Sequence, residues 1–203
     1  MLFRSMLLGQ GRMQPGEWVL VPGVSSGVGV AALQAAKALG GKVIGTSRSA
    51  VKLKKLKPFG LDAGLVSKGP DFAEAVMKAT GNHGADLIIN TVGGSIFEEC
   101  VRTAAFQGRI AMVGYLDRCV NSVIDLAKLH AQRLRIYGVS NRHRTAATRS
   151  LTVQAFIRDL LPAFADGRIK PLIDQIYSFD ELPQAKARME SDAQTGKIVI
   201  RIA

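Results

Sequence analysis

The sequence predicts an α/β protein with a doubly wound, mostly parallel sheet. Short apolar runs alternate with segments of helical periodicity along the 203 residues, which is the pattern of repeated strand–helix–strand units. The runs are apolar throughout, as expected of strands that are covered on both faces. Because crossovers between parallel strands are right-handed, helices are expected on both sides of the sheet.

Local signals define the expected elements. The predicted strands are residues 18–21, 42–46, 65–66, 85–92, 109–113 and 134–139, followed by an extended piece at 173–178 and a terminal strand at 197–202. The predicted helices are residues 28–39, a segment after Ser49, and residues 71–79, 96–105, 125–132, 146–165 and 181–190. Gly40 and Gly41 form a suitable C-terminal stop for the first helix, and Ser49 is a suitable N-cap.

The composition is that of an ordinary globular protein. Hydrophobic residues make up 47% of the chain and charged residues 21%, and this length suffices for one domain with a substantial core. No apolar run approaches the roughly 20 residues of a membrane span. The apolar start is interrupted by Arg4 and is predicted to be a helix, not a signal peptide. We expect a cytoplasmic protein in which Cys100 and Cys119 are reduced.

The chain is strongly basic, with a formal net charge of +11. Such a charge suits either nucleic acid or an anionic cofactor together with a basic surface. The basic residues gather in two separate groups, at residues 52–57 and 133–149, without a zinc finger, an RNA-recognition signature or interleaved aromatic residues. Nucleic acid is therefore not the expected main partner.

A glycine turn carries the clearest functional signal. The apolar run at residues 18–21 leads through Gly23, Gly27 and Gly29 into a helical pattern. Glycines also occur in ordinary turns, but between a strand and a helix they let backbone N–H groups face a phosphate. We predict a pyrophosphate site in which Ser25 and Ser26 add hydroxyl donors, Gly27 permits close approach and Gly29 permits tight helix packing.

The residues after the second strand indicate which dinucleotide is bound. An acidic residue there would bind a free ribose 2′-hydroxyl, but the chain has Ser47, Arg48 and then Lys52. These side chains suit a 2′-phosphate, and therefore NADP(H) over NAD(H). The alternative is a solvated turn with a helix N-cap.

Two further strand ends supply candidate residues. Ligands of doubly wound sheets bind at the carboxyl ends of the strands, where Asn90, Gly114 and Tyr115 are expected. We predict that Asn90 lies by the nicotinamide ribose, that Gly114 lets the ring pack closely and that Tyr115 forms a wall. Asn90 could equally be a polar strand end that leads into a turn. The histidines have no ligand spacing, so no metal site is predicted, and no catalytic residue is identified.

The order of these motifs resembles a known family. VLVPGVSSGVGVAALQAAKALGGKVIGTSRS, then GADLIINTVGG, GRIAMVG and the ending at residues 179–200 resemble the medium-chain dehydrogenase/reductase superfamily, in its quinone oxidoreductase-like and zinc-type alcohol dehydrogenase-like branch. The resemblance implies an NADP(H)-dependent oxidoreductase with a Rossmann lobe. It places Ser26, Gly27 and Val28 at the pyrophosphate, and Ser47, Arg48 and Lys52 at the 2′-phosphate.

The resemblance also implies a second lobe. Family members carry a GroES-like catalytic lobe ahead of the segment that matches residues 2–15, so the chain is expected to lack it. Residues 1–203 would then be one NADP(H)-binding domain, whose last part (about 171–203) could belong to the remnant of the catalytic lobe. Alone, it is expected to be inactive or weakly active. A homodimer through the edge strand at residues 134–139 is expected.

The expected reaction is hydride transfer from NADPH to a small-molecule substrate: a quinone, a carbonyl or an activated alkene. One alternative is an enoyl reductase module of a fatty-acid or polyketide synthase. Another is a non-catalytic module that binds NADPH or associates with RNA. A short-chain dehydrogenase is not favoured, because Tyr115, Tyr137 and Tyr177 each lack a lysine four residues later.

Overall fold

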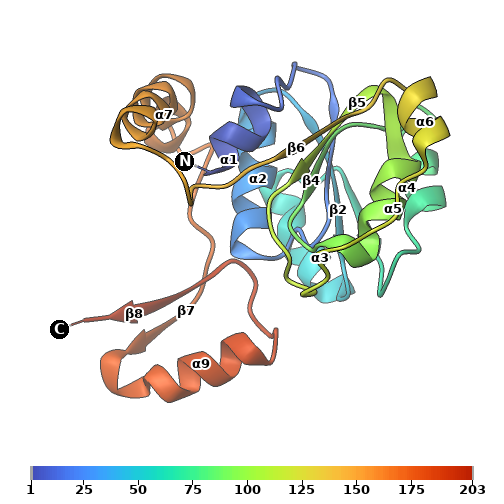
Figure 1. Cartoon of the computed structure of the whole chain (residues 1–203). Helices are drawn as coiled ribbons and strands as arrows, with labels where there is room; N and C mark the ends of the chain where they lie inside the picture. The colour runs from blue at the N-terminus through green and yellow to red at the C-terminus, as the bar shows by residue number, and fades with distance from the viewer. Residues whose placement is uncertain (1, 203) are drawn as a thin grey trace.

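The computed structural model describes residues 2–202. Its main sheet is parallel throughout (Figure 1). Its strands are β1 (Trp18–Val21), β2 (Lys42–Ser47), β3 (Ala63–Val66), β4 (Ala85–Asn90), β5 (Ala104–Met112) and β6 (Arg135–Gly138). Their order across the sheet is β3-β2-β1-β4-β5-β6. The strand order therefore reverses between β1 and β4, which confirms the predicted doubly wound α/β fold.

Short and medium helices precede, connect and follow these strands. They are α1 (Leu2–Arg4), η1 (Ser5–Gly9), α2 (Gly27–Ala38), α3 (Ala50–Leu56), η2 (Lys57–Phe59), α4 (Ala73–Ala79), η3 (Gly94–Ile96), α5 (Phe97–Thr103), α6 (Leu126–Ala131), α7 (Ala146–Asp159) and α8 (Leu161–Ala165). Within residues 2–202, none of the helices combines the length and the apolar character needed to cross a membrane.

The strands bury side chains in two apolar cores, one on each face of the sheet. Val19 and Val21 of β1 pack in the core that includes residues of α2 and α3, whereas Leu20 packs in the core that includes residues of α4 and α5. All three side chains are fully buried. Burial on both faces explains why β1 is apolar throughout and does not alternate with polar residues.

Most predicted boundaries differ from the structure by a few residues, and two of the differences change the elements themselves. The helix predicted for residues 96–105 ends at Thr103, and β5 already begins at Ala104, where its pairing with β4 is irregular. The single helix predicted for residues 146–165 is divided into α7 and α8 at Leu160. The division has a local cause, because Pro162 has no N–H to donate to the carbonyl four residues earlier.

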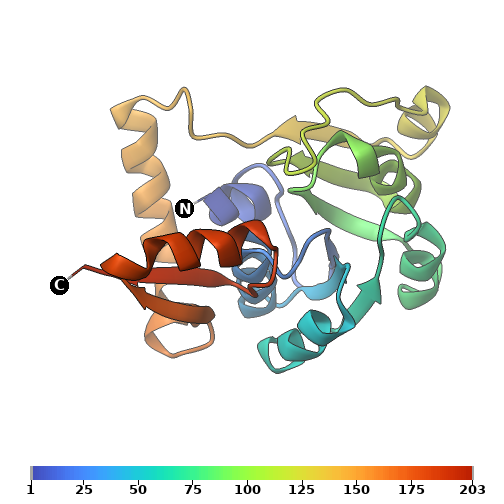
Figure 2. The same cartoon turned by 90° about the horizontal axis from the view of Figure 1, so that it is seen from below.

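Residues 173–201 form a separate C-terminal unit, which lies beside the main sheet unit in Figures 1 and 2. It comprises β7 (Ile173–Ser178), η4 (Phe179–Glu181), α9 (Leu182–Glu190) and β8 (Lys197–Arg201). The strands β7 and β8 pair in parallel as a second sheet.

Backbone and side-chain hydrogen bonds attach the C-terminal unit to α2 and the turn before it. The Gly196 N–H donates to the carbonyl oxygen of Ser25 over 3.0 Å. Before the unit begins, the buried Gln34 amide donates to the carbonyl of Lys170 (2.9 Å) and accepts from the N–H of the same residue (2.8 Å). The first contact joins the unit to the turn before α2, and the second holds the chain against α2 just before the unit begins.

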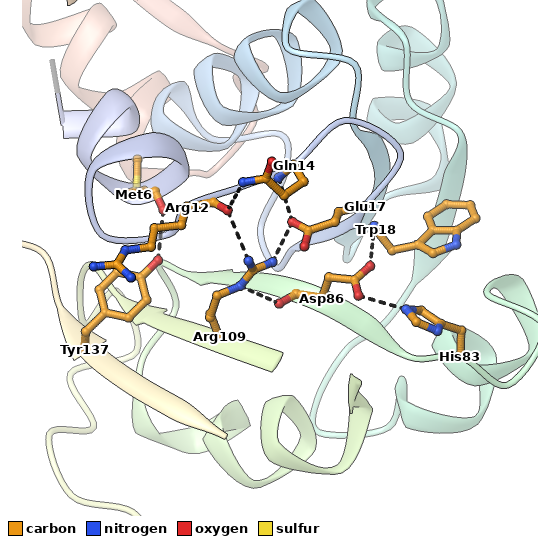
Figure 3. Close-up of polar contacts among 9 residues, drawn as sticks. All are labelled: Met6, Arg12, Gln14, Glu17, Trp18, His83, Asp86, Arg109 and Tyr137. Carbon is orange, nitrogen blue, oxygen red and sulfur yellow. Dashed lines mark hydrogen bonds and ion pairs between the residues drawn. The ribbon is translucent and has the colours of Figure 1, made fainter. Parts of the chain in front are cut away.

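A polar network holds the amino ends of the strands together (Figure 3). The Arg109 guanidinium donates to a Glu17 carboxylate oxygen (2.6 Å) and to the Asp86 carbonyl (3.2 Å). The Asp86 carboxylate accepts from the Trp18 N–H (2.8 Å) and pairs with His83 (2.8 Å). This network stabilises the end of the sheet that lies opposite the carboxyl ends of the strands.

Candidate functional site

The glycine turn connects β1 to α2 at the point where the strand order reverses. Ser26 is the N-cap of α2, and its hydroxyl oxygen accepts from the Gly29 N–H over 3.0 Å. A Cβ on Gly29 would lie 2.6 Å from the Gly23 carbonyl oxygen and 2.7 Å from the Val24 Cα. Gly29 therefore lets α2 approach the turn closely, and the N-terminus of α2 opens towards the carboxyl ends of the strands.

The carboxyl end of β2 lies next to this turn. Ser47 is the last residue of β2, and its hydroxyl lies 3.4 Å from that of Ser25. Ser49 is the N-cap of α3 and accepts from the Lys52 N–H. This cap fixes the first turn of α3 directly after Arg48.

A cleft of about 830 Å³, here named the basic cleft, opens between these elements. Its lining includes Ser25, Ser26, Ser47, Arg48 and Lys52. The structure thus brings together residues from the glycine turn, the end of β2 and the start of α3 that the sequence assigned to one ligand. Three hydroxyl groups and two cationic side chains in one cleft suit a phosphorylated ligand.

Two acidic residues, Asp117 and Asp192, also line the basic cleft, although neither lies near Arg48 in the sequence. Asp192, between α9 and β8, forms an ion pair with Arg48 in which Nη2 and Oδ2 are 2.5 Å apart. The Lys52 ammonium donates to the Asp192 carbonyl oxygen. The pKa of Lys52 is lowered because burial disfavours its charge; the Asp192 carboxylate opposes this shift and Arg48 adds to it.

A second cleft, of about 470 Å³, continues from the first and is named here the glycine cleft. Its lining includes Gly27, Val28, Gly114 and Gly196. The two clefts share Ser26, Leu116 and Gln194. They therefore meet beside the N-terminus of α2 and extend across the carboxyl ends of β2, β1, β4 and β5.

Asn90 and Tyr115 lie differently from the other predicted site residues. Asn90 is fully buried; its amide donates to the Gly93 carbonyl (2.9 Å) and accepts from the N–H groups of Val92 (3.0 Å) and Gly93 (2.9 Å). Tyr115 is exposed and, unlike its neighbours Gly114 and Leu116, is not among the residues that line either cleft. The Asn90 side chain therefore stabilises the turn after β4. Contact of Asn90 or Tyr115 with a ligand stays a prediction.

Three residues of the C-terminal unit were missed by reasoning from the sequence. Asp192 and Gln194 line the basic cleft, and the Lys197 side chain lies across Gly27, with Cε 2.7 Å from where a Cβ on Gly27 would stand. The Gln194 Oε1 atom is buried and has no hydrogen-bond partner within residues 2–202. These positions belong to the ending that resembles the family, but no local signal places them beside a turn about 170 residues earlier.

A strand, a glycine turn and a helix at the reversal of strand order, with cations at the end of the next strand, define a dinucleotide-binding domain. A profile of the zinc-binding dehydrogenases matches residues 27–156. An acryloyl-coenzyme A reductase of Sulfurisphaera tokodaii is 31% identical over 94% of this chain, which is 52% of that protein. The chain belongs to the zinc-binding dehydrogenase family, in the medium-chain dehydrogenase/reductase superfamily, and corresponds to its C-terminal cofactor-binding part.

Two further comparisons extend this result. A phenolphthiocerol/phthiocerol polyketide synthase polypeptide of Mycobacterium tuberculosis is 29% identical over 95% of this chain, which is 9% of that protein. A mycobacterial protein solved with NADPH is similar with a TM-score of 0.84 and 25% identity, over 98% of this chain and 61% of that one. The chain therefore spans about half of the reductase and a small part of the synthase.

The zinc of the family name has no ligand set in the described part of the chain. Among residues 2–202, no three or more His, Cys, Asp or Glu side chains gather in a way that could hold a metal ion. Cys100 is buried and Cys119 is partly buried, and both are free thiols. No zinc site is assigned to these residues.

Proposed function

We propose that the chain is the cofactor-binding lobe of an NADPH-dependent oxidoreductase that reduces a quinone, a carbonyl or an activated alkene. The observation that carries this proposal is the convergence of Ser25, Ser47, Arg48 and Lys52 on the basic cleft, beside the N-terminus of α2. The cleft suits the adenosine 2′-phosphate, and the helix N-terminus suits the pyrophosphate. When bound, NADPH supplies the hydride.

The glycine cleft fits the nicotinamide end of the same cofactor. Gly114 leaves room beside the backbone, whereas the flexible Lys197 side chain lies in the space beside Gly27. The Gln194 Oε1 atom, which has no hydrogen-bond partner within residues 2–202, offers a buried acceptor where the two clefts meet. This chain's residues therefore bind and orient the cofactor and exclude water. We assign no proton donor to them, so the chain alone is expected to show little turnover.

The names of the relatives support more than one acceptor. Two relatives are named quinone oxidoreductase-like proteins, whereas other names point to an activated alkene. One relative is named an acryloyl-coenzyme A reductase, and others are polyketide synthases. An enoyl reductase is thus a second form of the same proposal, with a thioester-conjugated alkene in place of a quinone. The two forms differ in substrate and share the cofactor site.

The C-terminal unit and the edge of the main sheet each suggest a surface that contacts another part of the protein: a catalytic lobe and a second copy of the chain. We infer that residues 171–203 belong to the sheet system of a catalytic lobe, because β7 and β8 pair apart from the main sheet. Within residues 2–202, the edge strand β6 pairs only with β5. A homodimer formed through β6 is therefore also proposed, and light scattering measures the oligomeric state.

The free thiols of Cys100 and Cys119 are consistent with a cytoplasmic location.

Arg48→Ala tests the cofactor assignment. Loss of a charge-assisted contact to phosphate is expected to weaken NADPH binding about 10- to 100-fold and to leave NADH binding unchanged. Fluorescence titration of the full chain measures both affinities. Arg149→Ala removes an exposed arginine of α7 and serves as the control. Equal affinity of the unaltered chain for NADH and NADPH would contradict the proposal.

A further inference from the structure

One residue of the C-terminal unit contacts both cations that the proposed function assigns to the 2′-phosphate. The Asp192 carboxylate pairs with Arg48, and the Asp192 carbonyl oxygen accepts from Lys52. Asp192 lines the same cleft as these two side chains. A carboxylate is an anion with hydrogen-bond-accepting oxygens, so in this structure it takes the role at Arg48 that a phosphate would take.

The backbone at Asp192 directs the residue into the cleft. Asp192 follows Ser191, the C-cap of α9, and has a φ of +53°. Helices often end in such a left-handed residue, which is most often glycine and sometimes asparagine. The Asp192 N–H donates to the Met189 carbonyl over 3.2 Å, which closes the end of α9. The residue at this position thus needs a left-handed conformation, but the helix end does not require a negative charge.

The ion pair is open to water and is easily exchanged. The Arg48 and Asp192 side chains keep 69% and 64% of their surface exposed. Exposed pairs of this kind stabilise a protein only slightly, because solvent screens the attraction. A phosphate with two negative charges and three acceptor oxygens would therefore displace the carboxylate, at the cost of that weak pair.

We propose that Asp192 is a specificity-determining residue that competes with the 2′-phosphate of NADP(H) for Arg48 and Lys52. The inference rests on the proposed function. NADH carries a hydroxyl at this position and does not have to displace the carboxylate. Asp192 therefore lowers the affinity for NADPH without lowering that for NADH, and binding of NADPH releases the turn between α9 and β8 from the basic cleft.

Asp192→Asn tests the competition with little change of shape. Asparagine keeps the left-handed backbone and the carbonyl contact to Lys52, and it removes only the charge. NADPH affinity is expected to rise about threefold, the equivalent of a weak exposed ion pair, while NADH affinity stays the same. The affinity for the cofactor fragment 2′,5′-ADP should rise by the same factor, and the affinity for AMP, which lacks the 2′-phosphate, should not change. Asp180→Asn, an exposed carboxylate elsewhere in the C-terminal unit, is the charge-matched control.

The outcomes separate this inference from the proposed function. An equal gain for NADPH and NADH would show a general charge effect and overturn the competition, as would an unchanged NADPH affinity. A loss of NADH affinity would show that Asp192 accepts from the ribose hydroxyl, which also overturns it. If Arg48→Ala weakens NADPH while Asp192→Asn changes nothing, only the competition fails. If neither variant alters NADPH binding, the cofactor assignment fails as well.

Discussion

The two sheets of this chain are both parallel but are stabilised in different ways. Strand β4 of the main sheet is almost entirely buried, with fully buried Leu87, Ile88 and Ile89. Strand β7 of the small sheet exposes most of its residues, including Ile173 and Ile176. The main sheet therefore depends on packing, whereas the small sheet depends on a few polar contacts, some of which lead to the proposed cofactor site.

The largest loss of stability is expected from a substitution at the point where α2 packs most tightly against the turn before it. In Gly29→Val, the new side chain would overlap backbone atoms of Gly23 and Val24, which cannot move away as a flexible side chain can. A non-glycine residue gains up to about 1 kcal/mol in helix propensity, but overpacking costs about 3 kcal/mol. Denaturant titration should show a net loss of stability, together with loss of NADPH binding.

Gly138→Ala is the control for this variant. An added Cβ on Gly138 meets no atom within 4 Å, so its stability should stay close to that of the unaltered chain. If Gly29→Val were equally neutral, the close approach of α2 to the turn would not matter for folding.

An intermediate loss of stability is expected when a buried polar contact of the small sheet is removed. The Asp174 carboxylate accepts from Arg188 (2.6 Å) and from the Thr195 N–H (3.1 Å). Asp174→Asn should destabilise β7 and β8 by about 1 to 2 kcal/mol and leave the main sheet intact. Hydrogen exchange resolved by residue measures this as faster exchange in the C-terminal unit alone. Asp166→Asn, in an exposed ion pair with Arg168, should change nothing measurable.

The Asp174 carboxylate should also make the stability of the small sheet depend on pH. Burial alone would raise the pKa of Asp174, but the hydrogen bonds from Arg188 and the Thr195 N–H outweigh it and lower the pKa. A carboxyl with a lowered folded-state pKa contributes stability above its unfolded value of about 3.9, and this is lost as the pH falls through the folded-state pKa. The small sheet should therefore lose protection in acid, and Asp174→Asn should abolish that step.

The smallest effect is expected at the N-cap of α2. Ser26→Ala removes the acceptor of the Gly29 N–H and should cost about 1 kcal/mol. It should also weaken NADPH binding, since Ser26 lines both clefts. Thr145→Ala removes the equivalent N-cap of α7 and should leave NADPH binding unchanged. An equal loss of NADPH affinity in both variants would mean that the cap acts on binding only through general stability.

The sequence was sufficient to predict the main sheet, because each strand between buried faces is a distinct apolar run. Residues 18–21 were predicted to the residue, and Ser49 caps α3 as predicted, whereas the capping of α2 by Ser26 was not predicted. The division of α7 from α8 was missed, although Pro162 could have indicated it. The unit at residues 173–201 was predicted as elements but not as a separate sheet, because pairing partners are a property of the folded chain.

The candidate site was predictable only where it is local in sequence. Ser25, Ser47, Arg48 and Lys52 follow two neighbouring strands, so the topology brings them together. Asp192 reaches Arg48 across 144 positions of the chain, and its position depends on how α9 ends and where β8 begins. No periodicity or motif encodes such a contact, which is why the sequence suggested a cleft free of acidic residues.

The Gln34 side chain is one of the contacts that hold the chain against α2 just before the C-terminal unit begins. The amide of Gln34 bonds to both backbone groups of Lys170, as a neighbouring strand would. The chain then enters the small sheet, which returns to the main sheet unit at Asp192 and Gly196. Moving β7, α9 and β8 away from the main sheet unit would require breaking the Gly196 bond to Ser25 and would carry Asp192 out of the basic cleft, so the position of the small sheet and the acidity of that cleft are linked.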